Sequence, residues 1–520
     1  MFLRVWQWIK EFLNKMINKT DVKTSLGVEV AISSLMADAL QTWSLMYANQ
    51  ATWLKKDEVF SLNLPATIAS EVTRAVTLEM KVKLGDSPRA VYLQEQLDVA
   101  VGKLRTQLEY GCAKGGLMMK PYVSGKKILV DFVQADQFYP VAFDASGNIT
   151  SCVFSDQRQI AGKFYTRLEY HKFTAGVGDK LGSCEIKNQA YKSTSINELG
   201  TACALTEVDV WKDLLPTATI KNLKEPIFAY FRYPAANNID PASPLGVSVY
   251  ARSVDLIGQA DKQWSMLLWE FDSGQRAIYV DELAFDKDSN KKPILPNRRL
   301  YRTMKTSGMS KEDMFEDWSP TFREQEILNG LEAILRKIEF NCGLSYGTIS
   351  NPDIVSKTAT ELKISKQRYY STITDVQKAL ELALGQLIRA MDNWATMSNL
   401  VAKGPINPVY DFDDSILVDK DMQFQMDLRL LDRVMGKVEF RMRNMGEDEE
   451  TAKKAIDKLT AEQPKVDLLG NPIIPGTKPG TKPGGQPDGQ SGKQPGGKQP
   501  ANMPFKKKPM LPLVKEKQNA

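Results

Sequence analysis

Few side chains of this sequence have the type and spacing that catalysis requires. The only histidine, His171, lies in an alternating Tyr-Glu-Tyr-His run, which is typical of a β-strand. A nucleophile needs a base within hydrogen-bond reach, and no Ser/His/Asp or Cys/His pair is recognisable around this residue. His171 is therefore interpreted as a surface or sheet residue and not as a catalytic base.

One acidic segment has the composition of a metal site, because two-metal nucleases need several carboxylates that converge on the ions. Its five aspartates are Asp411, Asp413, Asp414, Asp419 and Asp421. The segment lacks the glycine at the sixth and the glutamate at the twelfth position of a calcium loop. We expect these acids to border a strand and a turn, and a metal-dependent DNA-processing nuclease is the alternative that they leave open.

Two further features do not indicate a cofactor or metal site. The segment GKQPGGK at residues 492–498 imitates a phosphate-binding loop, but Gln499 replaces the Ser or Thr that binds magnesium. The five cysteines have no short metal-binding spacing, and their odd number argues against a complete disulfide framework, so a reducing compartment is expected. The sequence predicts no catalytic residue, no metal and no cofactor.

Charge is unevenly distributed along the chain. The net charge is +5, and residues 463–520 carry ten Lys against three acids, so this segment is +7 and the remainder is 5 − 7 = −2. The remainder is therefore not a basic surface for tight DNA capture, which depends on many Lys and Arg. The segment 463–520 is rich in Pro and Gly with few apolar side chains, and it is predicted to be disordered and dispensable for folding.

Residues 1–26 form a predicted amphipathic segment, since their apolar residues recur on one face of a helix. Lys10 and Glu11 interrupt any signal-peptide core, and the chain has no window of eighteen apolar residues, so no membrane span is predicted. We expect this helix to pack against the body of the protein or a partner. Binding to a membrane surface is the alternative.

The first half of the chain changes from helical to strand-like patterns. Residues 27–111 read as helical, with one candidate at 66–84 and another that begins at the cap Ser87-Pro88. Residues 117–233 read as an antiparallel meander. Its predicted strands include 127–133, 149–154, 164–171 and 206–211.

Helices dominate again in the second half. Two of them flank a small α/β insertion with the strands RAIYV and RRLYRTMK, and a capping box of Thr321 and Glu324 is predicted to start the second. After a Gly/Ser/Asn-rich loop, an uninterrupted helical pattern runs over 358–399, about 60 Å at ~1.5 Å per residue. A helix of this length needs neighbours along its whole length, and a coiled-coil or bundle helix is what the pattern alone predicts.

Four segments, taken together and in order, strongly resemble portal proteins of long-tailed, siphovirus-type bacteriophages of Gram-positive hosts. They are NNID at 237–240 with SPLGVSVY at 243–250, GLSYGTIS at 343–350, KTATELKISKQRYYSTITDVQKALE at 357–381, and DDSI at 413–416. Each segment alone is a common turn or helix start, and the shared order makes the resemblance specific. It covers about residues 25–460.

The resemblance implies an α+β portal fold with an α/β wing, long stem and tunnel helices, a small α/β clip and a helical crown. The implied boundaries are an N-terminal amphipathic segment at 1–26, the wing at 27–243, a stem helix at 244–274, the clip at 275–320, a second stem helix at 321–342, a tunnel loop at 343–357, the long tunnel helix with a return to the wing at 358–420, the crown at 421–462 and the tail at 463–520.

The resemblance further implies a ring of twelve subunits that forms a DNA channel at the capsid vertex for genome packaging, head-tail joining and DNA ejection, without enzymatic activity of its own. Implied partners are further copies of the chain, the terminase large subunit, a head-tail adaptor, scaffold or major capsid protein, and double-stranded DNA. The implied location is the virion, after assembly in the host cytoplasm. A minor capsid or adaptor protein is another alternative, although such proteins need no central rod.

The tunnel loop is the predicted site, because short polar residues can follow a phosphate backbone without reading base edges. The predicted channel residues are Gly343, Ser345, Tyr346, Gly347, Thr348, Ser350, Asn351, Lys357, Lys363 and Lys366. The three lysines are candidate charges facing the bore, with a solvated or intersubunit face as the alternative for each. An ordinary helix-helix connection is the simpler interpretation of the loop.

Overall fold

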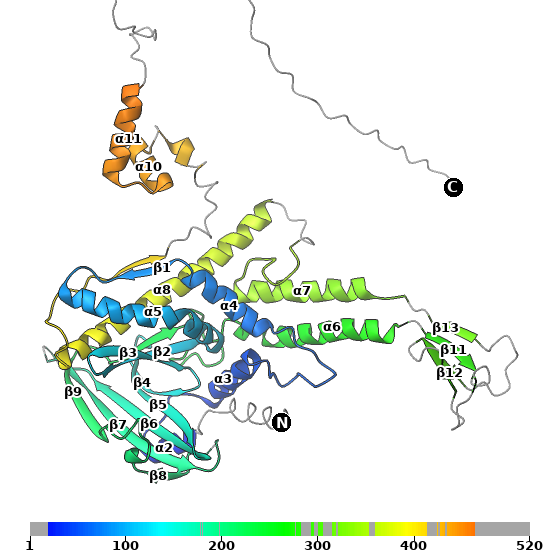
Figure 1. Ribbon diagram of the computed structural model, residues 1–520, viewed down its shortest axis with the longest axis horizontal. Coiled ribbons are helices and arrows are strands. Elements are labelled where there is room, and N and C mark those ends of the chain that lie inside the picture. Colours follow the sequence, from blue (N-terminus) through cyan, green and yellow to red (C-terminus); the bar gives the residue numbers. More distant parts are fainter. Residues whose placement is uncertain are drawn as a thin grey trace, which may run out of the picture. The chain divides into compact units, whose positions relative to one another are not determined.

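The chain divides into two compact units, residues 1–420 and 421–520, and each is described by itself. The computed structural model describes residues 19–412 and 424–462, apart from gaps at 177, 179, 197, 276, 282–285, 287–292, 296–299, 305–314, 319–320, 353–358, 425–426 and 432–433. Helices and antiparallel sheets are both present, which confirms the predicted α+β class (Figure 1). Most of the predicted N-terminal helix and the segment 463–520 lie outside the described residues.

The described part of the first unit begins with four helices: α2 (Lys19–Leu26), α3 (Ser34–Tyr47), α4 (Leu64–Thr77) and α5 (Pro88–Lys114). The predicted start of α5 is confirmed. The Ser87 hydroxyl accepts a hydrogen bond from the Ala90 amide, and Pro88 is the first helical residue. Proline fits there because its missing N–H has no partner in the first turn of a helix.

The predicted helix over 66–84 is wrong in its second half. Helix α4 ends at Thr77, and the alternating residues of β1 (Met80–Lys83) pair antiparallel with β14 (Val409–Phe412). A strand far away in sequence thus satisfies backbone groups that a longer helix would have satisfied locally.

Two antiparallel sheets follow α5 and confirm the predicted meander. The smaller has the order β10-β2-β3 and consists of β2 (Gly116–Ser124), β3 (Lys127–Gln134) and β10 (Ala229–Arg232). The larger has the order β4-β5-β6-β7-β8 with β9 also paired to β7, and consists of β4 (Phe138–Phe143), β5 (Ile149–Ile160), β6 (Lys163–Thr174), β7 (Gly182–Ser193), β8 (Thr201–Cys203) and β9 (Thr217–Leu223).

The predicted strand over 206–211 is wrong. The 3-10 helix η1 (Leu205–Glu207) occupies its start, and a turn hydrogen bond from the Trp211 amide to the Val208 carbonyl follows. Trp211 is buried, and its indole Nε1 donates to Asp156 Oδ2 at 3.0 Å. The bend places the large indole against the six-stranded sheet.

Helices α6 (Val254–Ser273) and α7 (Glu324–Cys342) pack side by side and lead out to a small sheet and back (Figure 1). A short 3-10 helix, η2 (Ala251–Ser253), precedes α6. Apolar residues that recur along the two helices are buried at Ile257, Leu331 and Ile338, whereas Phe271 and Phe340 are 47% exposed. The predicted capping box is wrong, because α7 begins at Glu324 without a side-chain cap and the Glu270 carboxylate of α6 accepts the amide hydrogen of Arg323 instead.

The sheet between these helices has the order β12-β11-β13, from β11 (Ala277–Asp281), β12 (Tyr301–Met304) and β13 (Phe315–Trp318). The first two confirm the strands predicted from RAIYV and RRLYRTMK, and the third was not predicted. Strand β11 is parallel to β12 and antiparallel to β13. The insertion was predicted to be α/β, but its described residues form strands and no helix.

Helix α8 (Ala359–Met397) has 39 residues, close to the predicted span of 358–399. Its predicted apolar stripe is confirmed by the buried residues Ile373, Val376, Leu380, Leu384, Leu387 and Met391. These residues pack on α4, α5 and the smaller sheet, so this part of α8 is a core helix of the first unit (Figure 1). Thr358 of the predicted capping box lies outside the described residues.

The second unit contains α10 (Lys437–Met445) and α11 (Glu449–Glu462). Apolar residues recur at every fourth position over 422–442, but the described residues of this segment do not form one helix. Gly436 has extended backbone angles (φ −76°, ψ 155°) and starts α10, so the chain is interrupted there. Arg441 and Glu447 then hold the α10 to α11 turn through two hydrogen bonds of 2.8 and 2.7 Å.

Candidate functional site

The loop that follows α7 starts at a glycine that the fold requires. Gly343 ends the helix with a left-handed backbone (φ +73°), which side chains disfavour. A Cβ at this position would lie 2.4 Å from the Thr372 hydroxyl of α8. The loop therefore leaves α7 in close contact with α8.

A single carboxylate from α7 organises the rest of this loop. The Oε1 atom of Glu339 accepts hydrogen bonds from the amides of Gly347 (3.0 Å), Ile349 (2.8 Å) and Ser350 (3.0 Å). Its Oε2 atom accepts the Ser350 hydroxyl at 2.9 Å. The Glu339 side chain is completely buried, so both carboxylate oxygens are occupied by the loop and none by solvent.

The small polar residues of the loop also bond with one another. The Thr348 hydroxyl donates to the Ser345 carbonyl at 2.6 Å and lies 3.0 Å from the Ser345 hydroxyl. The Asn351 amide donates to Glu332 Oε2 at 3.0 Å. The loop over 343–350 is therefore a compact turn in which several backbone amides are hydrogen-bonded.

A cation from α8 contacts the opposite side of the turn. The Arg368 guanidinium lies 4.6 Å from the ring centroid of Phe340 and 5.0 Å from that of Tyr346. It also donates to the Leu344 carbonyl at 3.3 Å. Cation–π contacts of this kind favour a fixed stacking geometry, so the turn is held between α7 and α8.

The predicted site residues thus differ in accessibility. Asn351 and Lys366 are exposed and Ser350 is buried, while the residues of intermediate burial are Gly343, Ser345, Tyr346, Gly347 and Thr348. Lys357 and the side chain of Lys363 lie outside the described residues. Sequence reasoning missed Glu339 and Arg368. Glu339 had one signal, since an acid in the last turn of a helix opposes the helix dipole.

Helix α6 presents an apolar face that no described residue of the chain covers. Met266 and Trp269 lie three residues apart, on the same side of the helix, and are 55% and 62% exposed. The opposite side of α6 is buried, at Ile257 and Leu267 among others. A tryptophan exposed to this degree beside a methionine is typical of an interaction surface.

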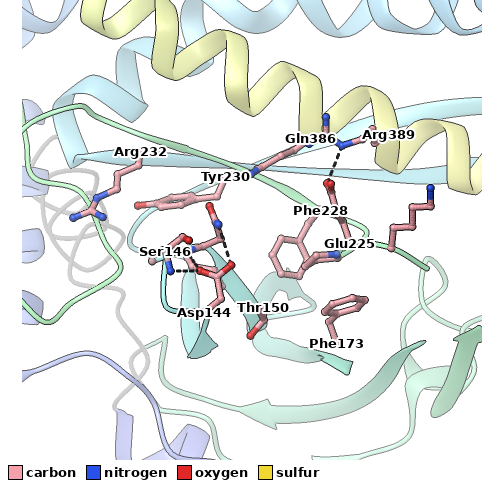
Figure 2. A pocket seen from close by; sticks show the side chains of 15 residues that line it. Asp144, Ser146, Thr150, Phe173, Glu225, Phe228, Tyr230, Arg232, Gln386 and Arg389 are labelled. Atoms are coloured by element: carbon pink, nitrogen blue, oxygen red, sulfur yellow. Dashed lines mark hydrogen bonds and ion pairs between the residues drawn. The ribbon is translucent and has the colours of Figure 1, made fainter. Parts of the chain in front are cut away.

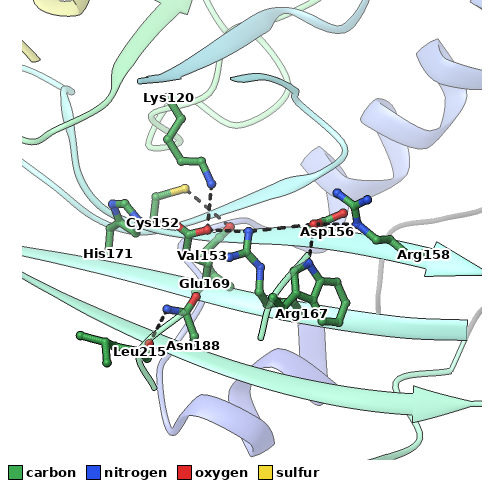
Figure 3. A network of polar contacts seen from close by, with 11 residues as sticks. Lys120, Cys152, Val153, Asp156, Arg158, Arg167, Glu169, His171, Asn188 and Leu215 are labelled. Carbon is green, nitrogen blue, oxygen red and sulfur yellow. Dashed lines mark hydrogen bonds and ion pairs between the residues drawn. The ribbon is translucent and has the colours of Figure 1, made fainter. Parts of the chain in front are cut away.

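The only histidine of the chain belongs to a buried ionic network (Figure 3). Its position in a sheet, on β6, is confirmed, whereas the surface position is wrong, because His171 is buried. Its Nε2 lies 2.6 Å from Glu169 Oε1, and Glu169 Oε2 also binds Lys120 (2.8 Å) and Arg167 (2.9 Å). Lys120 comes from β2, so the network joins the two sheets.

In this network, burial and the neighbouring charged groups shift the pKa values in opposite directions. Burial lowers the pKa of His171 below its usual value, although the hydrogen bond to Glu169 acts in the other direction. Burial alone would raise the pKa of Glu169, but Lys120, His171 and Arg167 outweigh it and hold that pKa well below the usual range. A neutral histidine that donates to a paired carboxylate stabilises the sheets. The Cys152 thiol lies opposite His171 on β5, but burial raises its pKa well above the usual value, so it is not a ready nucleophile.

A pocket of about 430 Å³ lies between the turn after β4, strand β10 and helix α8 (Figure 2). Its two acids are already satisfied. Asp144 accepts hydrogen bonds from the amides of Ser146 and Asn148, and Glu225 binds Arg389 Nε at 2.8 Å. No pair of groups in this pocket has the arrangement of a base and nucleophile.

Of the predicted acidic cluster, Asp411 lies on β14 opposite Lys81, and the other four aspartates are outside the described residues. All five cysteines are free thiols, and four of them are buried. In the part of the chain that the structure describes, no helix has the length and apolarity to cross a membrane.

Comparison with protein families identifies a match for most of the chain. The family model described as phage portal protein, SPP1 Gp6-like, matches residues 90–462, which is more than half of the 520 residues. The matched range includes both sheets, α6, α7, the loop after α7, α8 and the helices of the second unit. No curated protein matches the chain.

Proposed function

Because the chain belongs to the SPP1 Gp6-like family of phage portal proteins, we propose that twelve copies close into a ring at the capsid vertex and that DNA passes through its centre during packaging and ejection. The resemblance to portal proteins of long-tailed phages of Gram-positive hosts supports a siphovirus-type virion as its location, after assembly in the host cytoplasm. Head-to-tail contacts that close on themselves produce such rings.

The exposed apolar face of α6 is the main observation that supports ring formation. Met266 and Trp269 are half or more exposed in the isolated chain, and their burial against a neighbouring copy would remove a large apolar area from water. The segment from α6 to α7 projects as a pair of helices with a small sheet at its end (Figure 1). Equivalent pairs placed side by side around an axis would cover this face in every copy.

The proposed regions keep their expected boundaries, with a wing at 27–243, a stem formed by α6 and α7, a clip at 275–320 and a crown at 421–462. Proposed partners are the terminase large subunit, a head-tail adaptor, and scaffold or major capsid protein. The ring itself performs no covalent chemistry in this proposal, because a separate ATP-driven terminase moves the DNA.

The loop after α7 is proposed to line the channel. Exposed Asn351 of the loop and exposed Lys366 near the start of α8 are the described residues proposed for contact, and Lys357 and Lys363 are further candidates. The charge of −2 on residues 1–462 keeps such contacts weak, since tight binding needs many neutralised phosphates. Weak contact lets the DNA move.

The alternatives are less well supported. A metal-dependent nuclease of the packaging machinery has no support from the family match, and only Asp411 of its proposed acidic cluster is described. A minor capsid or adaptor protein would not need the stem, loop and long helix in this order.

Electron micrographs of the purified full-length protein test the proposal. We expect end-on class averages to show a closed ring with a central hole, and Trp269→Asp to abolish it. Ile160→Asp, at an exposed position at the end of β5, is the control and leaves the ring intact. If the wild-type protein remains monomeric at the protein concentration used for the variants, the proposed ring is wrong.

A further inference from the structure

We propose that Glu339 is a positioning residue of the channel: its buried carboxylate fixes residues 344–350 as a rigid turn on the end of α7. The inference that this turn acts on DNA rests on the proposed function. The inference that Glu339 determines its shape rests on geometry alone.

The hydrogen bonds are concentrated on one group. Three backbone amides, from Gly347, Ile349 and Ser350, point at one oxygen of Glu339, and the Ser350 hydroxyl occupies the other. Neighbouring amides that converge in this way form an anion-binding concavity, here filled by a side chain of the same chain. Removal of the carboxylate would leave several donors without a partner at once.

The position is unfavourable for an acid unless its carboxylate is used. Burial of a charged group costs free energy, and the carboxyl end of a helix repels negative charge. Glu339 meets both conditions, being completely buried in the last turn of α7. Four hydrogen bonds from the loop offset these costs, so the acid and the turn stabilise each other.

A neutral amide weakens this arrangement. A glutamine keeps one acceptor oxygen for the three amides, and its NH₂ group faces the Ser350 hydroxyl, which then has to accept instead of donate. Glu339→Gln therefore conserves the size of the side chain and removes the charge that strengthens its hydrogen bonds.

The second anchor lies on α8. Arg368 stacks on Tyr346 and donates to the Leu344 carbonyl, on the part of the turn that Glu339 does not reach. The turn is thus fixed to α7 through its end and to α8 through its beginning. Exposed Asn351 follows directly, so its position is determined by the turn and not by a flexible linker.

Amide hydrogen exchange on the full-length protein tests the positioning role. In Glu339→Gln we expect the amides of residues 347, 349 and 350 to exchange about tenfold faster, because hydrogen bonds to a neutral oxygen are weaker than those to a carboxylate. Glu332→Gln is the matched control, because Glu332 accepts only the amide of Asn351 among these residues. Unchanged exchange at 347–350 in a folded Glu339→Gln protein overturns the proposal.

If Glu339→Gln does not fold, Ser350→Ala is the variant used for the hydrogen-exchange test. It removes one donor and keeps the carboxylate, and we expect a smaller increase in exchange confined to 347–350. No increase overturns the proposal in this case too.

DNA packaged per assembled ring separates the two claims. We expect Glu339→Gln to form rings of normal size that package less DNA, while Glu332→Gln packages at the wild-type level. Faster exchange with wild-type packaging would leave Glu339 as the residue that shapes the turn and would overturn the channel role of the turn.

Discussion

Glu270 and Arg323 join the two helices that flank the small sheet at 275–320. Arg323 donates through Nη2 to Glu270 Oε2 at 2.8 Å, through Nε to Oε1 at 3.2 Å, and through its backbone amide to Oε1 at 3.1 Å. A carboxylate of α6 thus receives both the side chain and the backbone that start α7. The pair fixes the point where the chain leaves the stem and returns to it.

The first prediction concerns this pair. We expect Glu270→Gln and Arg323→Gln each to speed proteolysis within residues 275–323, because either change weakens the closure at the base of the sheet. The double variant should be hardly more sensitive than either single variant, since both remove one shared interaction. Additive effects in limited proteolysis would show that the two residues act independently.

Arg89 gives the second prediction. Its buried guanidinium binds the Asp392 carboxylate at 2.7 Å and the Val401 carbonyl at 2.8 Å, which ties α5 to the end of α8. Arg89→Met should lower the free energy of unfolding by about 3 kcal/mol, because it leaves several acceptors unpaired. Lys103→Met, at an exposed position of the same helix, is the control and should change stability little. Equal effects in denaturant unfolding would contradict this role of Arg89.

Gly343 gives the third. Gly343→Ala forces a side chain into a left-handed backbone and against Thr372, and we expect a loss of about 1–3 kcal/mol in the free energy of unfolding. Gly102→Ala is expected to change the free energy of unfolding in the opposite direction. Gly102 lies within α5 with open space around its Cβ position, so alanine should stabilise the protein by about 0.5–1 kcal/mol. A stabilising Gly343→Ala would contradict the close contact of the loop with α8.

The buried ionic network predicts how stability depends on pH. The pKa of His171 is lowered on folding, so its contribution is complete above the unfolded value near 6.5 and is lost as the pH falls below it. The pKa of Glu169 is also lowered, so its contribution is lost when the pH falls below about 4.5. Both groups act in the same direction, and acid should therefore destabilise the sheets in two successive ranges.

His171→Gln tests this assignment, because the chain has no other histidine. Melting temperatures measured between pH 7 and pH 5 should fall for the wild type and fall less for the variant. An identical decrease in both proteins would show that another group causes the acid sensitivity.

The sequence predicted the elements whose stabilisation is local and periodic. The apolar stripe of α8, from Ile373 to Met391, indicated its burial, and Ser87 with Pro88 marked the start of α5. Predictions failed where the local conformation depends on a partner that is distant in sequence. Residues 80–83 are a strand only because residues 409–412 pair with them, and Glu270 replaces the cap predicted at Thr321.

The candidate loop shows the same division. Its place between α7 and α8 followed from the helical patterns on either side. Its shape did not follow from the sequence, because Glu339 and Arg368 fix it. Sequence reasoning missed Glu339 because its partners are mainly backbone amides, which every residue except proline carries and which leave no compositional signal.

DNA crosslinking in stalled packaging complexes tests the central claim most directly. Asn351→Cys, combined with Cys203→Ser and labelled with a thiol-directed photocrosslinker, places the probe at the exposed end of the loop. Ile160→Cys in the same background places it at the exposed end of β5. We predict that illumination joins DNA to the subunit at position 351 and not at position 160. Normal rings that hold DNA but crosslink equally at both positions, or not at all at 351, would contradict a channel lined by this loop.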